Sequence, residues 1–431
     1  MRDRTATAAH DPLHARCLVL DNGDTQIAIV VCDSCMIPRE VFDAAKRQAE
    51  EKTGIPAGHM LMSATHTHTA PASAGVFQSD PDEKYRQFLA QRIAEGIEQA
   101  HAQLEPARVG WGVGLDPSQV FNRRWFMKSG TLNEDPFGRT TDQARMNPGV
   151  GNPALARPVG PTDPEVCLLS VQSTDGRPIA LLANYSLHYV GGVPGGAVSA
   201  DYFGEFARRI AERIGATELD PPFVGIMSNG TSGDINNVNF SLKTRPQQEP
   251  FEQIQVVAAS VADAAYQAYQ RIEYHDWAPL AVAEREIELD VRLPSVEDLM
   301  NAKHRLAEAG PGPYRDRADI YARETVLLSE YPQTVQAQIQ AIRIGNLGIV
   351  SSPCETFVET GLAIKEDSPF DVTFTIELAN GYNGYLPTPE QHALGGYETW
   401  RARSSYLAVD AEPKIRRTQL ELLEEAAKEE K

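Results

Sequence analysis

An apolar run over residues 60–64 ends abruptly in His66-Thr67-His68, and this feature constrains the fold most. The run predicts a buried strand, and in a strand residues i and i+2 project from the same face. Both imidazoles are therefore expected to meet at the strand's end. Neutral imidazole is a common zinc ligand, and a second ring can be another ligand or an acid–base group. The alternative is a pair of histidines that only caps the strand.

The rest of the chain alternates strand and helix patterns, which predicts an α/β fold with mixed sheets layered against helices. Asn22-Gly23 predicts a hairpin turn between the first two strands. Strands are expected at 16–20, 26–32, 60–64, 107–113, 165–171, 179–187, 223–227, 335–344 and 374–378. Helices are expected at 40–51, 83–103, 202–214, 252–269, 296–309 and 419–428. We expect a single domain over residues 1–431, with residues 280–345 as a peripheral insertion.

Net charge and the distribution of apolar residues restrict the classes of partner that the chain can have. The chain of 431 residues carries a formal charge of -19, which argues against a nucleic-acid partner because a basic surface is missing. No stretch is apolar enough to predict a membrane span, and Met1-Arg2-Asp3-Arg4 does not lead into a signal-peptide core. We expect a small-molecule substrate and a cytoplasmic location, with a processed secreted form as the alternative. The sequence leaves the oligomeric state open.

The five cysteines are scattered and odd in number, which is a poor disulfide framework. Cys32 and Cys35 have the spacing of redox and zinc sites, but no second pair accompanies them. We interpret them as ordinary small residues that close a buried strand.

Four further apolar segments end in groups that bind metals or oxyanions. They lead to His188, to the turn from Asn229 to Asp234, to Glu355, and to Tyr382 and Tyr385. Strand ends in α/β folds meet in one crevice, so we expect these groups to lie together. Each also has a structural explanation. His188 could be a packed histidine, Glu355 a favourable first-turn carboxylate, Asp234 a turn residue, and the tyrosines residues of a loop edge.

The order and local sequence of these motifs resemble the neutral/alkaline (non-lysosomal) ceramidase family, over its catalytic domain. The resemblance runs from Asp11-Pro12-Leu13 to Tyr397. The motifs that carry it are Ala64-Thr65-His66-Thr67-His68, Phe121-Asn122-Arg123, Asn184 to His188, Ser228-Asn229 to Gly233-Asp234, Pro353-Cys354-Glu355, and Asn380-Gly381-Tyr382-Asn383-Gly384-Tyr385 with Thr388-Pro389-Glu390.

The resemblance implies one catalytic zinc ion per chain. Its ligands would be His66, His188, Glu355 and Tyr385, a set that suits zinc chemically. His68, Arg123 and Tyr397 are implied as catalytic groups. Asn229, Asp234, Asn236 and Tyr382 are expected to bind substrate.

The chain also departs from the family pattern. The family carries a serine shortly after the Gly-Asp dipeptide, where this chain has Asn236, so we expect metal-activated water to be the nucleophile. Cys354 stands where the family usually has glycine. The family's C-terminal β-sandwich domain is not matched, and the strand that usually precedes Asp11 is missing, so the N-terminus is expected to be truncated or differently built.

The substrate is expected to be small and polar. The inserted loop carries Arg124, Trp125, Lys128, Arg139 and Arg145, which suit hydroxyls or carboxylates better than acyl chains, unless they only solvate a surface loop. We therefore expect a zinc hydrolase that cleaves an amide or ester, including sugar or amino-acid conjugates. A true ceramidase is the alternative. An amidohydrolase-type metalloenzyme and a non-catalytic binding module are the further alternatives.

Overall fold

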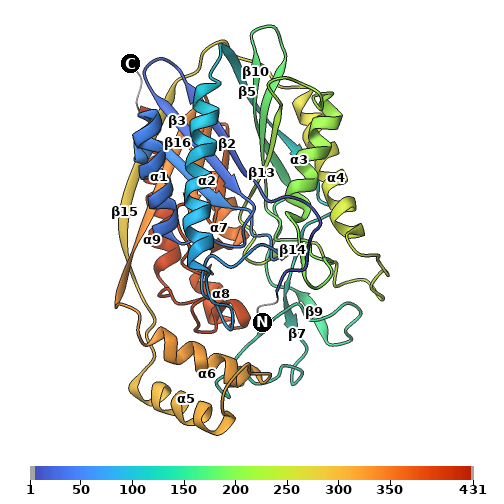
Figure 1. The fold of residues 1–431 in the computed structure, drawn as a ribbon. Coiled ribbons are helices and arrows are strands. Elements are labelled where there is room, and N and C mark those ends of the chain that lie inside the picture. Colours follow the sequence, from blue (N-terminus) through green and yellow to red (C-terminus); the bar gives the residue numbers. More distant parts are fainter. Residues whose placement is uncertain (1–4, 429–431) are drawn as a thin grey trace.

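Three β-sheets pack their inner faces against one another, and a pair of helices covers the outer face of each (Figure 1). The structure is a computed structural model that describes residues 5–428. The shared core contains the alternating residues Ile27, Ile29 and Val31 of one sheet, with Leu169 and Ile349 from the other two. The mixed α/β fold predicted from the sequence is confirmed.

The first sheet has the order β2-β3-β4, formed by β2 (Ala15–Asp21), β3 (Gln26–Cys32) and β4 (Met60–Ala64). The predicted hairpin joins β2 to β3: Gly23 has a φ of 94°, and Asn22 Oδ1 accepts hydrogen bonds from Asp24 N and Thr25 N. Helices α1 (Arg39–Thr53) and α2 (Glu83–Ala102) cover the outer face. The alternation of buried residues in β3 between the two faces fixes this layering.

The second sheet has the order β13-β11-β10-β5. Its strands are β5 (Ala107–Leu115), β10 (Glu165–Ser173), β11 (Pro178–Tyr185) and β13 (Val224–Asn229). Helices α3 (Asp201–Ile214) and α4 (Glu252–Tyr269) cover it, and lie opposite α1 and α2 in Figure 1.

The third sheet has the order β15-β16-β17-β19. Its strands are β15 (Leu280–Asp290), β16 (Thr334–Ile344), β17 (Leu347–Ser352) and β19 (Val372–Glu377), under helices α7 (Val358–Asp367) and α9 (Ala411–Lys428). Helices α5 (Val296–Ala309) and α6 (Arg317–Leu328) project at the lower end of Figure 1. The structure does not test whether residues 280–345 are an insertion, so this stays a prediction. Within that range, β15 and β16 belong to the third sheet, and α5 and α6 project from it.

Short elements complete the described chain, and six of them are two-residue strands. They are β1 (Ala8–Ala9), β6 (Phe121–Asn122), β7 (Arg124–Met127), β8 (Ala144–Met146), β9 (Leu155–Pro158), β12 (Ala197–Val198), β14 (Ile235–Asn236), β18 (Glu355–Thr356), β20 (Tyr385–Leu386), α8 (Pro389–Ala393), η1 (Ala57–His59) and η2 (Tyr397–Thr399). Two pairs of these short strands position the site: β18 pairs with β20, and β14 pairs with β6.

Each of the three large sheets contains one parallel pair of strands that is joined through a helix. The pairs are β3 and β4 with α1, β11 and β13 with α3, and β17 and β19 with α7. Ligands in open α/β sheets lie beyond the carboxyl ends of such strands. Every predicted ligand follows one of these strands, so the topology brings the polar strand ends together.

The predicted elements agree closely with the structure. The strand expected at 179–187 ends at Tyr185, and the final helix begins at Ala411 instead of residue 419. Among the described residues no helix is long and apolar enough to cross a membrane. Met1 to Arg4, on which the signal-peptide prediction rests, lie outside the described residues.

Candidate metal centre

The two histidines of the His-x-His motif lie just beyond β4, in a loop instead of the strand. His66 has a φ of 74°, in the left-handed region that residues other than glycine rarely adopt. The two Nε2 atoms are nevertheless 3.1 Å apart. The predicted convergence is thus correct, but the period of a strand is the wrong reason, because a strained turn directs the rings. Backbone strain of this kind is concentrated at functional sites.

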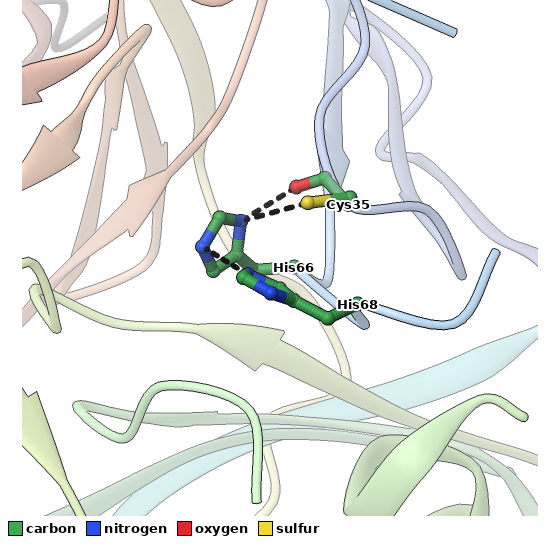
Figure 2. A group of neighbouring side chains, drawn as sticks. All are labelled: Cys35, His66 and His68. Atoms are coloured by element: carbon green, nitrogen blue, oxygen red, sulfur yellow. Dashed lines mark hydrogen bonds between the residues drawn. The ribbon is translucent and has the colours of Figure 1, made fainter. Parts of the chain in front are cut away.

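Hydrogen bonds fix the orientation of both buried imidazoles. His66 Nδ1 lies 2.6 Å from the carbonyl oxygen of Cys35, and His188 Nδ1 lies 3.2 Å from that of Ser232. A carbonyl only accepts, so we assign the proton of each neutral ring to Nδ1. Figure 2 shows the contacts of His66 with Cys35 on one edge of the ring and with His68 on the other. In the neutral form of each ring, the lone pair is then on Nε2, which is the nitrogen that can bind a metal.

These free nitrogens face one another and a carboxylate. His66 Nε2 lies 3.1 Å from His188 Nε2, and Glu355 Oε2 lies 3.4 Å from the first and 4.0 Å from the second. Glu355 is 2% exposed, and its Oε2 has no hydrogen-bond partner among the described residues. Ligands at about 2.0–2.2 Å in a tetrahedron lie about 3.3–3.6 Å apart. One of the three separations lies in this range and the other two lie within 0.4 Å of it, so small shifts of the side chains would let the three donors hold a zinc ion.

The electrostatics of the cluster also favour a cation at this point. Burial alone lowers the pKa of His66, but the neighbouring Cys35 and Glu355 outweigh it and raise this pKa well above its usual value. Burial raises the pKa of Glu355, but the charge of His66 outweighs it and lowers the pKa overall. Burial and then the charge of Arg123 lower the pKa of His188. The cluster thus attracts positive charge to His66 and keeps His188 neutral.

Tyr385 and Arg123 complete this side of the site. Arg123 Nη2 donates to the hydroxyl of Tyr385 at 3.1 Å and to the carbonyl of Gly233 at 2.7 Å. Arg123 Nε donates to Glu398 Oε1 at 3.1 Å, which anchors the guanidinium from behind. Burial raises the pKa of Tyr385 well above its usual value. The ring of Tyr397 lies edge-on to that of Tyr385, with centroids 5.8 Å apart.

The predicted substrate-binding residues lie at different depths. Tyr382 donates its hydroxyl proton to Glu355 Oε1 at 2.9 Å, so it contacts a predicted ligand directly. Asn229 is fully buried, with its Nδ2 3.5 Å from Thr65 O and no described partner for its Oδ1. Asn236 bonds to Asn147 at 2.7 Å. These roles stay predictions.

Asp234 is enclosed by the fold. Its Oδ2 accepts from Asn122 at 2.7 Å, and its Oδ1 accepts from the backbone N–H of Val358 at the start of α7. Burial raises its pKa to about 6. Both oxygens are thus occupied by contacts that join β6 and α7, and the predicted role of Asp234 in binding substrate stays a prediction.

Arg124 corrects one expectation. The sequence suggested a loop arginine that faces the substrate, but its side chain is fully buried. It donates to Glu398 Oε2 at 2.6 Å and to Gln391 Oε1 at 3.1 Å. Glu398 therefore bridges Arg123 and Arg124, because two buried guanidinium groups need a carboxylate between them.

Sequence reasoning missed several residues around the cluster. Tyr189 stacks on the solvent-exposed ring of His68, with centroids 3.7 Å apart. Cys35, Ser232 and Glu398 hold His66, His188 and Arg123. Tyr189 and Glu398 directly follow predicted site residues in the chain, which was the one signal that could have identified them.

Comparison with known proteins identifies solved structures that have a similar fold. No protein-family model matches the chain. The structure is similar to that of neutral ceramidase from Pseudomonas aeruginosa, with a TM-score of 0.68 and 18% identity, over 97% of this chain and 72% of that one. It is also similar to a ceramidase complexed with C2, with a TM-score of 0.67 and 17% identity, over 97% of this chain and 73% of that one. At this identity the likeness shows the fold alone: the chain has a neutral-ceramidase-like fold, and the resemblance drawn from the motifs is confirmed at that level.

Proposed function

We propose that this protein is a zinc-dependent hydrolase that uses water to cleave an amide or ester bond of a small polar substrate. The observation that carries the proposal is the meeting of two imidazole lone pairs with a buried, unpartnered carboxylate oxygen. Burial of such a group without a partner is costly, and a bound cation removes that cost. The ceramidase-like fold supports a hydrolase.

His66, His188, Glu355 and Tyr385 are the residues that would hold the ion. Zinc supplies Lewis acidity when bound, which polarises a carbonyl group and lowers the pKa of water. The Nδ1 bonds to Cys35 O and Ser232 O keep both imidazoles turned toward the ion, and such outer bonds orient metal ligands.

His68 is suited to proton transfer. Desolvation, and then the charges of His66 and Arg123, lower the pKa of His68 well below its usual value, so the ring is neutral near pH 7. A neutral imidazole that is reachable from solvent can accept a proton from the attacking water and return it to the leaving amine or alcohol. The stacked ring of Tyr189 holds His68 in place for both steps.

Arg123 is suited to stabilising negative charge. Its guanidinium is fixed by Glu398 and Gly233, so its position is set before substrate arrives. A preorganised donor beside a developing oxyanion lowers the barrier to acyl transfer. Tyr397, packed against Tyr385, would contact the same part of the substrate.

A nearby cavity supports a polar substrate. It has a volume of about 450 Å³ and is bordered by Trp400, whose ring centroid lies 6.1 Å from that of Tyr397. Arg139, Arg292 and Arg401 line it together with Asp135 and Asp142, and such charged groups can hydrogen-bond to hydroxyls or carboxylates. This lining favours a hydroxylated or carboxylated substrate, including sugar or amino-acid conjugates.

A true ceramidase is the second candidate, and the likeness to ceramidase structures is the observation that favours it. The amidohydrolase alternative loses support, because the described strands form separate sheets instead of an eight-stranded barrel. A non-catalytic module would need no cluster of free metal donors.

The test is hydrolysis by the zinc-loaded protein of short acyl amides, polar esters, N-acyl amino acids and a ceramide. We expect turnover of polar substrates, and a loss of about 10²–10⁴-fold in kcat for His68→Gln with zinc retained. His304→Gln, at an exposed position on α5, is the matched control. Turnover of ceramide alone would support the second candidate, and no turnover of any substrate by zinc-loaded protein would contradict a hydrolase.

A further inference from the structure

Glu377, the last residue of β19, is a fully buried acid behind the metal centre. Its Oε1 accepts a hydrogen bond from Ser232 Oγ at 2.6 Å. Its Oε2 accepts from the backbone N–H of Thr356 at 2.7 Å and from that of Ser232 at 3.3 Å. One carboxylate therefore holds two loops, and it makes no hydrogen bond to a predicted ligand among the described residues.

One of these loops contacts a predicted ligand, and the other carries one. The carbonyl of Ser232 accepts the hydrogen bond from His188 Nδ1, and Thr356 follows Glu355 directly in the chain. A backbone hydrogen bond of 2.8 Å from Gly233 N to Thr356 O joins the same loops. Glu377 thus accepts hydrogen bonds from the residue whose carbonyl contacts His188 and from the residue that follows Glu355 in the chain.

Burial of a carboxylate is costly, and its hydrogen bonds must offset that cost. A hydrophobic residue would fill the same space at lower cost if packing were the only role. The carboxyl group instead collects donors from the residue whose carbonyl orients the ring of His188 and from the residue that follows Glu355. Groups of this kind, outside the ligands themselves, commonly tune metal sites.

We propose that Glu377 is a positioning residue that sets the metal affinity of this centre by holding His188 through Ser232 and Glu355 through Thr356. The inference rests on the proposed function, since it presumes that the cluster binds zinc.

The experiment measures zinc dissociation constants of the full chain by competition with a chelator of known affinity. Glu377→Gln places an amide group where three donors now point, and we expect zinc to bind about 10- to 100-fold more weakly. Ser232→Ala keeps the carboxyl group of Glu377 and the carbonyl that His188 Nδ1 contacts, and removes the hydroxyl bond to Glu377 together with the 3.4 Å contact of that hydroxyl with His188 Nδ1. We expect a smaller weakening in the same direction, so this second variant decides the question if the first does not fold.

Asp116 offers a matched control. It is a buried acid that also accepts from one backbone N–H and from hydroxyl groups, those of Ser118 and Ser260, away from the cluster. Asp116→Asn should lower the melting temperature of the metal-free protein and leave the zinc affinity unchanged.

The outcomes separate the two proposals. If the wild type binds one zinc ion and both Glu377→Gln and Ser232→Ala bind it as tightly, the positioning role is overturned and the proposed function stands. If Glu377 were only structural, its variant would behave as Asp116→Asn does, with lower stability and unchanged affinity. A wild type that binds no zinc overturns the proposed function and this inference with it.

Discussion

At the scale of single residues, His66 shows how the site differs from a strand end. Its left-handed backbone costs roughly 1–2 kcal/mol for a residue with a side chain. Hydrogen bonds from its backbone N–H to Ser34 O and from its ring to Cys35 O hold it in that conformation. The His-x-His spacing alone identified the residue, but the turn that aims it depends on these tertiary contacts.

Cys35 tests which atom holds His66. The sulfur lies 3.8 Å from His66 Nδ1, while the carbonyl oxygen lies at 2.6 Å, so the carbonyl is the stronger acceptor. We predict that Cys35→Ala retains the zinc ion with an affinity within about threefold of wild type, because the backbone bond remains. Chelator competition measures this. Complete loss of zinc would instead make the thiol a ligand.

Asn236 tests the identity of the nucleophile. It stands where the ceramidase family has a serine, and its described side-chain hydrogen bonds are with Asn147 and with the backbone N–H of Val238, not with the cluster. We predict that Asn236→Ala keeps kcat within about tenfold of wild type, since water does not depend on this side chain. A near-complete loss of activity with zinc still bound would show that Asn236 has a catalytic or positioning role.

At the scale of elements, local patterns predicted most of the long helices and main strands, because hydrophobic periodicity and turn residues act over a few positions. The predicted ranges did not include α6, α7, α8, β15 and β17. The residues that support the predicted ligands and Arg123 were not predictable in this way. Glu377 reads as the end of an ordinary strand, and Arg124 as a loop charge, until tertiary packing brings Ser232 and Glu398 to them. No local pattern in the sequence marks such contacts.

Helix α8 carries a group that makes the protein sensitive to acid. Burial, and then the charges of Arg292 and Arg124, lower the pKa of His392 to about 3. An unfolded histidine has a pKa of about 6.5, so between these values the unfolded state binds a proton that the folded state does not. Stability contributed by neutral His392 is therefore lost as the pH falls.

We predict that the free energy of unfolding falls less for His392→Gln than for wild type between pH 7 and 4.5, by roughly 1–2 kcal/mol. Urea unfolding at the two pH values measures it. The exposed His304→Gln is the control for loss of an imidazole. Equal losses in wild type and His392→Gln would contradict the assignment.

At the scale of the whole molecule, the predicted ligands come from segments that follow strands of all three sheets: His66 and His188 lie in loops, and Glu355 and Tyr385 begin the paired short strands β18 and β20. A bound ion would join these sheets, so we predict that zinc at 100 times its dissociation constant stabilises the fold by about 2.7 kcal/mol. A rise in melting temperature on adding zinc to metal-free protein measures this. The same rise in His66→Ala/His188→Ala would show that zinc acts elsewhere.

We expect the strand ends of the three sheets to build one zinc site. Elemental analysis of purified wild type beside His66→Ala/His188→Ala measures the metal content of that site. We predict one zinc ion per wild-type chain and none in the variant. Equal metal content in the two proteins, or none in either, would show that the chain shares the ceramidase-like fold without its metal chemistry.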